Sequence, residues 1–205
     1  MASSLAWTIV GPWPIDAPMT DADSPLPGLD ERALVEACLA GRAGAFDLIV
    51  DRHKRSVYQL CFRFVGNHED ASDLSQDVFL RAYRGLRSFR GQSSIATWLY
   101  RIGVNVCLNR VSVKAPAVEP IGDRVLADER GESPAERLLR DERGVRVRQA
   151  IAQLPRKQRA TLVLRTYHEM SHQEIAEVLG SSVGAVKANF FHALANLKRI
   201  LESES

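Results

Sequence analysis

The sequence predicts an all-α protein of two small helical bundles joined by a flexible linker, with a helix-turn-helix in the second bundle. Apolar residues recur at steps of three and four, and no stretch alternates convincingly with period two. Residues 115–134 are rich in proline, glycine and acids without a sustained period, which indicates a linker. Residues 44–115 carry 11 basic and 6 acidic side chains and residues 135–205 carry 12 and 8, so two basic blocks flank this acidic segment.

Length and composition exclude several classes of protein. The chain has 205 residues, of which 45% are hydrophobic and 25% charged, which is ordinary for a soluble globular protein. Its three cysteines are widely spaced and form no C-x-x-C motif, so the sequence encodes neither a disulfide framework nor a four-thiolate zinc site. We therefore expect a reducing, cytoplasmic location, and no run of apolar residues is long enough for a membrane helix.

The basic blocks fit two surfaces that meet a polyanion such as nucleic acid, because neutralisation of phosphates by Lys and Arg drives such binding. Solvated, arginine-rich helix faces would explain the same charges.

The first bundle is predicted over residues 29–114, after a disordered leader at residues 1–28 in which Met19 is an alternative start. Gly66 and Asn67 end its first long helix, and a second helix runs from Asp70 to Leu86. The apolar positions of its three helices are Phe46, Ile49, Val50, His53, Val57, Leu60, Cys61 and Phe64; Leu74, Val78 and Ala82; and Ile95, Leu99, Ile102 and Val106.

The second bundle is predicted over residues 135–205. One helix with Val147, Ala150, Ile151 and Leu154 ends at Pro155, which suits the first turn of the next helix.

A helix-turn-helix is predicted within this bundle. Ser171 and Glu174 have the spacing of a capping box, and Gly180 suits a left-handed helix end. Ile175, Ala176 and Leu179 form the inner face of the first helix, and Val183, Val186 and Phe190 begin the stripe of the second. Such a unit binds DNA through its second helix in the major groove, although an αα-hairpin of no special purpose has a similar pattern.

The residues HEMSH, from His168 to His172, match the H-E-x-x-H zinc signature. That signature needs both histidines on one continuous helix, whereas Ser171 is predicted to start a new helix between them. We expect no metal, no cofactor and no catalytic residues, and a zinc hydrolase remains the unfavoured alternative.

The motifs DASDLSQDVFLRAYRGL, FRGQSSIATWLYRIGVN and SHQEIAEVLGSSVGAVK, in this order and spacing, resemble a group 4 (extracytoplasmic function, ECF) sigma factor of the sigma-70 family of bacterial RNA polymerase. The resemblance covers roughly residues 30–202. It implies that the first bundle is region 2, which binds core polymerase and the minus-ten element, and that the second is region 4, which binds the minus-thirty-five element.

By position, the resemblance assigns three sets of residues. The helix that binds the clamp coiled coil of core polymerase contains Asp73, Leu74, Gln76, Asp77, Phe79 and Leu80. The minus-ten set, which includes the loop that captures a flipped base, is Arg90, Ser93, Ser94, Thr97, Arg101, Asn105 and Arg110. The minus-thirty-five set is Arg165, Lys187, Ala188, Phe191 and His192.

The chain departs from the family pattern at two places. The basic run that usually follows the minus-ten helix is reduced to VSVK, so Lys114 stands nearly alone. The recognition helix reads GAVKANFFHALANLK, without the usual arginines that contact guanine, so promoter preference does not carry over.

The resemblance implies a promoter-specificity subunit that performs no covalent chemistry. Its expected partners are core RNA polymerase, promoter DNA and an anti-sigma protein, with no small-molecule substrate. A nearer alternative than the zinc hydrolase is a helix-turn-helix regulator that binds DNA without polymerase.

Overall fold

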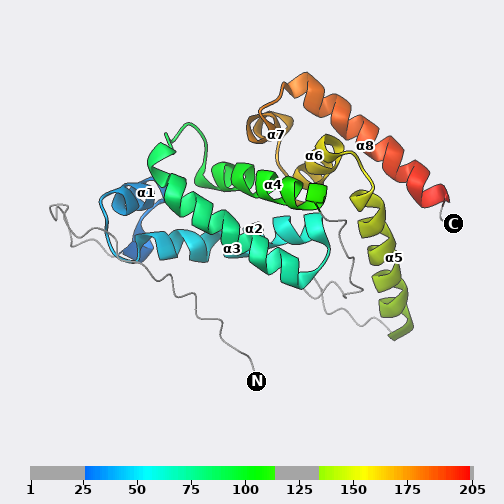
Figure 1. Ribbon diagram of the computed structural model, residues 1–205, viewed down its shortest axis with the longest axis horizontal. Coiled ribbons are helices and arrows are strands. Elements are labelled where there is room, and N and C mark those ends of the chain that lie inside the picture. The colour runs from blue at the N-terminus through cyan, green and yellow to red at the C-terminus, as the bar shows by residue number, and fades with distance from the viewer. Residues whose placement is uncertain (1–25, 114–133, 204–205) are drawn as a thin grey trace. The chain divides into compact units, whose positions relative to one another are not determined.

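The computed structural model describes residues 26–113 and 134–203, and all regular structure within these ranges is helical (Figure 1). The all-α prediction is confirmed. The elements are η1 (Leu26–Gly28), α1 (Glu31–Leu39), α2 (Ala45–Val65), α3 (His68–Gly85), η2 (Leu86–Ser88), α4 (Ile95–Val113), α5 (Pro134–Ala152), α6 (Arg156–Tyr167), α7 (His172–Leu179) and α8 (Val183–Ser203).

The chain divides into two compact units after Val50, which lies inside α2. In the first unit, Asp30 caps α1 by accepting a 2.8 Å hydrogen bond from the Ala33 N–H, and Leu34 and Cys38 are buried. The sequence pattern did not predict this helix. Apart from η1 and the first residue of α5, the predicted leader and linker lie outside the described residues, so the predicted domain borders stay predictions.

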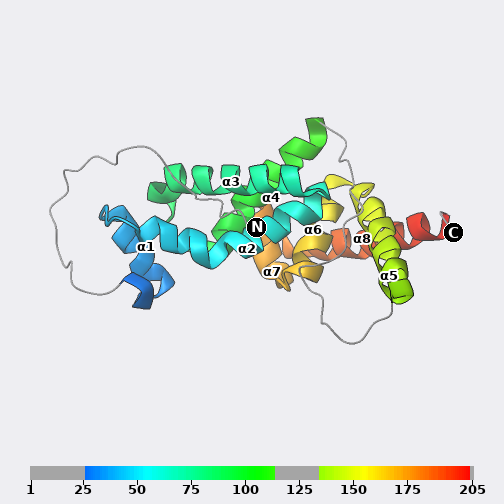
Figure 2. The same cartoon turned by 90° about the horizontal axis from the view of Figure 1, so that it is seen from below.

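Helices α3 and α4 pack side by side in the second unit and position one group of candidate residues (Figures 1 and 2). Leu60, Val78 and Leu99 are fully buried, as their apolar spacing predicted. A Cβ atom at Gly103 would lie 2.8 Å from Leu60 Cδ2, so this glycine leaves room for the Leu60 side chain of α2 against α4. Asn67 caps α3 after Gly66, whose φ of +77° ends α2 in the left-handed region.

Helices α6, α7 and α8 pack on one another and position the second group (Figure 2). Leu164, Ile175 and Val186 are fully buried among them. Two details differ from the prediction. On α7 Val178 is buried beside Ile175 and Ala176, whereas Leu179 is only half-buried. On α8 the buried stripe is Val186, Ala193 and Ile200, while Val183 is exposed and Phe190 half-buried. Within the described ranges no helix is long and apolar enough to cross a membrane.

Candidate nucleic-acid interface

The turn between α7 and α8 has the geometry that the sequence predicted. Ser171 Oγ accepts a 3.2 Å hydrogen bond from the Glu174 N–H, and Glu174 Oε2 accepts one of 2.7 Å from the Ser171 N–H. These hydrogen bonds to Ser171 lower the pKa of Glu174. Gly180 ends α7 with a φ of +56°, and Ser182 caps α8 by accepting from the Ala185 N–H at 3.2 Å. Together they form a capped helix-turn-helix whose second helix begins at Val183.

The predicted residues on α8 all reach the surface. Lys187, Ala188 and His192 are exposed, and Phe191 is 70% exposed. Arg165, on α6, is half-buried, and its guanidinium donates a 2.8 Å hydrogen bond to the Met170 carbonyl at the start of α7. The structure therefore brings four of the five residues of this set onto one helix, and the fifth braces the segment before α7.

The predicted residues on α3 divide into two groups. Asp73, Gln76 and Leu80 are exposed, with Leu80 at 44%, whereas Leu74 and Phe79 are buried at 9% and 3% exposure. Leu74 and Phe79 thus hold α3 against the core and offer little contact surface. Asp77 lies at the edge of the exposed group and forms a 2.9 Å ion pair with Arg81, one turn further along α3.

The segment before α4 is built around the helix start. Ser94 Oγ accepts a 3.1 Å hydrogen bond from the Thr97 N–H and so caps α4, and the hydroxyl oxygens of Ser94 and Thr97 lie 2.9 Å apart. Thr97 is buried at 8% exposure. Trp98 is half-buried and packs on Phe89 with ring centroids 5.2 Å apart. Arg90, Arg101 and Asn105 are exposed, and Ser93 is half-buried.

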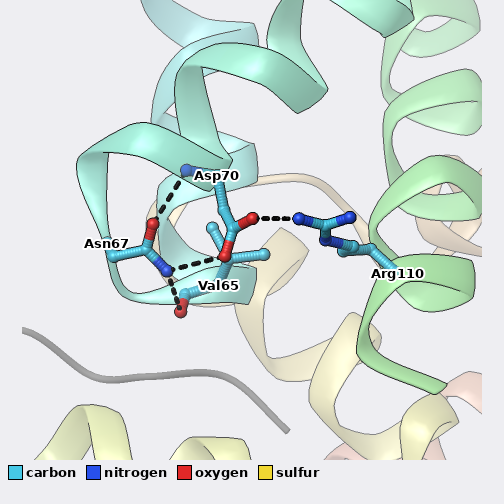
Figure 3. Close-up of polar contacts among 4 residues, drawn as sticks. All are labelled: Val65, Asn67, Asp70 and Arg110. Carbon is cyan, nitrogen blue, oxygen red and sulfur yellow. Dashed lines mark hydrogen bonds and ion pairs between the residues drawn. The ribbon is translucent and has the colours of Figure 1, made fainter. Parts of the chain in front are cut away.

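Arg110 pairs with a carboxylate that the sequence analysis did not assign (Figure 3). Its guanidinium donates to Asp70 at the start of α3. Asp70 in turn accepts a 2.9 Å hydrogen bond from the Asn67 side-chain amide and donates its own N–H to Asn67 Oδ1 at 2.8 Å. Arg110 therefore links the end of α4 to the cap of α3. DNA that binds the Arg110 guanidinium would compete with Asp70 for it.

The HEMSH residues do not lie on one helix. His168 ends α6, Glu169 has a φ of +53°, and Ser171 caps α7, so the predicted break between the two histidines is confirmed. His168 Nδ1 lies 3.2 Å from the Tyr100 hydroxyl. Burial lowers the pKa of His168 to about 4, and the charge of Arg63 adds to this shift. In the part of the chain that the structure describes, no group of three or more His, Cys, Asp or Glu side chains could hold a metal ion.

Two arginines, Arg148 and Arg159, are buried, which the sequence pattern did not predict. Arg159 on α6 is only 3% exposed, and it donates to the carbonyl of Phe64 at the end of α2 while its guanidinium lies 5.6 Å from the ring centroid of that residue. Burial lowers its pKa to about 10, so it stays charged at neutral pH. A single arginine in a helical pattern is normally predicted to lie on the surface. No sequence pattern near Arg159 indicates a partner 95 residues away.

The helical fold and the capped α7–α8 turn define a helix-turn-helix protein of the DNA-binding class. Residues 49–115 match the Sigma-70 region 2 family, and residues 144–197 match the Sigma-70, region 4 family. The RNA polymerase sigma-H factor of Pseudomonas aeruginosa is 37% identical over 183 residues, which cover 84% of this chain and 94% of that protein.

Two further relatives agree. ECF RNA polymerase sigma factor SigW of Bacillus subtilis is 35% identical over 172 residues, covering 78% of this chain and 91% of that protein. The solved structure of CnrH in complex with the cytosolic domain of CnrY is similar with a TM-score of 0.62 and 29% identity, covering 85% of this chain and 99% of CnrH. The chain belongs to the ECF group of the sigma-70 family, and it is an RNA polymerase sigma factor.

Proposed function

We propose that this sigma factor uses two separate surfaces, α3 for core RNA polymerase and α8 for the upstream promoter element. The observation that supports this most directly is the exposure of Lys187, Ala188, Phe191 and His192 on the second helix of a fully capped helix-turn-helix. In such units the second helix lies in the major groove and its first turns reach the base edges. The α8 set therefore faces the minus-thirty-five element.

The polymerase surface consists of Asp73, Gln76, Asp77 and Leu80, the members of the α3 set that are not buried. Two carboxylates beside an exposed leucine suit the basic face of a coiled coil, because the charges orient the partner while Leu80 packs. Leu74 and Phe79 support this surface from the core.

The minus-ten surface runs from the segment before α4 along the exposed side of that helix. Arg90 and Arg101 are placed to bind the DNA backbone, and Ser93, Ser94 and Asn105 to contact an unstacked base. Thr97 contributes by fixing Ser94, since its hydroxyl lies 2.9 Å from that of Ser94. Arg110 serves this surface through its pair with Asp70.

An anti-sigma protein is a further proposed partner. CnrH, which is 29% identical to this chain, was solved in complex with the cytosolic domain of CnrY. A comparable antagonist would need to cover the exposed α3 surface or the outer residues of α8 to block initiation. We propose no covalent chemistry for the chain itself.

Two pairs of substitutions test the separation of the surfaces. Asp77→Ala with Leu80→Ala should weaken binding to core polymerase and leave the helical content unchanged, because both residues lie on the surface. Lys187→Ala with His192→Ala should preserve holoenzyme assembly and weaken binding to the upstream element, with about 1 to 3 kcal/mol lost for each base contact.

Core affinity and promoter affinity of the holoenzyme are measured for both variants at several salt concentrations. Base contacts weaken binding to particular sequences, whereas phosphate contacts weaken binding to all sequences and reduce the salt dependence. Equal losses of both affinities in both variants would contradict the two-surface proposal.

A further inference from the structure

The outer face of α8 carries an unusual exposed side chain. Phe191 is 70% exposed, more than any other large hydrophobic residue whose burial the structure describes, and the next is Leu194 at 46%. Exposed apolar residues are common singly on protein surfaces, so exposure alone explains nothing. The position of Phe191 on the second helix of the helix-turn-helix is what gives this residue a candidate role.

Phe191 belongs to the face that would enter a DNA groove. Gly184, Lys187, Ala188 and Phe191 follow one another at helical spacing and are all exposed, opposite the buried stripe that starts at Val186. We call these four residues the outer face of α8. Eight residues separate Val183 from Phe191, about 12 Å along a helix axis. Phe191 thus lies roughly two turns from the start of α8, and the N-terminal residues of the second helix are those that contact base edges in such units.

The charges of α8 favour a polyanion over a basic protein surface. Its cations are Lys187, Lys198 and Arg199, and its single carboxylate, Glu202, lies in the last turn. Within Val183–Leu194, Lys187 is the only lysine or arginine. The outer face therefore has one positive charge, on Lys187, that can attract DNA. It lacks the arginine that usually contacts guanine through two hydrogen bonds.

Apolar side chains read a different feature of the major groove. Thymine presents a 5-methyl group there, and Ala and Phe side chains contact it. We propose that Phe191 reads the 5-methyl group of a thymine in the upstream promoter element and that this contact contributes to promoter choice. The edge of the His192 ring lies against Phe191, with centroids 5.7 Å apart, and limits the directions open to the phenyl ring. This inference rests on the proposed contact between α8 and promoter DNA.

Replacing thymine by deoxyuridine tests the proposal, because it removes the methyl group and leaves the hydrogen-bonding edge intact. The full chain is assembled with core polymerase, and duplexes are first selected from a library with a randomised upstream element. Each thymine of the selected element, on either strand, is then replaced singly. The wild-type holoenzyme should lose about fourfold in affinity at one position, as expected for one buried methyl group.

Variants assign that loss to the side chain. Phe191→Ala should bind the thymine duplex about as weakly as the wild type binds the uridine duplex, and should no longer distinguish the two. Phe191→Leu should retain part of the difference. Leu194→Ala is the matched control, since it removes another exposed apolar side chain of α8 and should keep the full uridine effect.

Two results would overturn the inference. If no uridine duplex binds more weakly, or if Phe191→Ala keeps the uridine effect, Phe191 does not read a methyl group. If Phe191→Ala leaves promoter affinity unchanged, the exposed ring serves a protein partner instead. In these cases selection of an upstream sequence still supports the proposed function, whereas a holoenzyme that selects no upstream sequence contradicts both proposals.

Discussion

The family resemblance assigned residues on α3 and on α8 in the same way, by position. In the structure the two sets differ in how exposed their side chains are. On α8 the assigned residues Lys187, Ala188, Phe191 and His192 are all exposed. On α3 two of six assigned residues, Leu74 and Phe79, are buried. A family resemblance locates the helix that meets a partner, but burial decides which side chains of that helix can touch it.

The largest effect should come from a substitution on the buried side of α3. Phe79→Ala removes a ring that is 3% exposed, and we expect it to lower the free energy of unfolding by about 3 to 5 kcal/mol. Denaturant unfolding followed by circular dichroism measures this loss. Leu80→Ala, at the adjacent exposed position, should change stability by no more than about 0.5 kcal/mol. Similar losses for both variants would remove the distinction between the two faces of α3.

The second effect extends the comparison from α3 and α8 to two histidines. The pKa of His168 is about 4 in the fold, below the ordinary 6.5, so the fold favours the neutral imidazole. Its stabilising contribution is complete above about pH 6.5 and is lost as the pH falls towards about 4, by up to about 3 kcal/mol.

Unfolding free energies of the wild type and His168→Gln, measured between pH 4 and 7, test this expectation. The variant should lose less stability on acidification than the wild type. His192→Gln, at an exposed position on α8, should follow the wild-type curve. Parallel curves for the wild type and His168→Gln would show that His168 does not contribute to acid sensitivity.

The third effect concerns the N-cap of α7, the first helix of the helix-turn-helix. Ser171→Ala removes the hydroxyl that accepts from the Glu174 N–H and should cost about 1 kcal/mol of stability, a typical value for an N-cap. Ser171→Asp restores an acceptor and should recover most of the loss. A loss of equal size in Ser171→Asp would mean that the hydroxyl itself, not capping, is required.

The smallest effect concerns the left-handed end of α7. Gly180 has a φ of +56°, and a Cβ atom there would meet nothing within 4 Å, so Gly180→Ala should suffer only the backbone cost of about 1 kcal/mol or less. Gly180→Asn should lose less, because asparagine tolerates this conformation better. Thermal unfolding ranks the variants, and equal melting temperatures for Gly180→Ala and wild type would argue against a strained turn.

The structure also separates what local sequence patterns can predict from what they cannot. The all-helical fold, the Ser171 capping box and the Gly180 turn were predictable because each depends on residues within one or two helical turns. The ion pair of Arg110 with Asp70 joins residues that are 40 positions apart. The spacing of residues along a helix cannot predict a contact between two helices so far apart in the sequence. Burial of Leu74 was consistent with its own stripe of apolar residues, but the family assignment placed the same residue at an interface.

More of the residues that the family resemblance assigned are exposed on α8 than on α3. The reason is physical: α8 fully buries only Val186, Ala193 and Ile200 of its 21 residues, so much of its circumference remains exposed. Helix α3 buries six residues over Ala71–Ala82, so less of its circumference remains for a partner.

Promoter-dependent transcription by bare core RNA polymerase tests the central claim most directly. Core enzyme is supplied with the purified chain and a template that carries a promoter selected by the holoenzyme, and run-off transcripts are measured with and without the chain. The two-surface account predicts transcripts only when the chain is present, and their loss both with Asp77→Ala and Leu80→Ala and with Lys187→Ala and His192→Ala. Binding of the chain to the promoter without core enzyme, and without any transcript when core enzyme is added, would contradict the account and indicate a helix-turn-helix regulator.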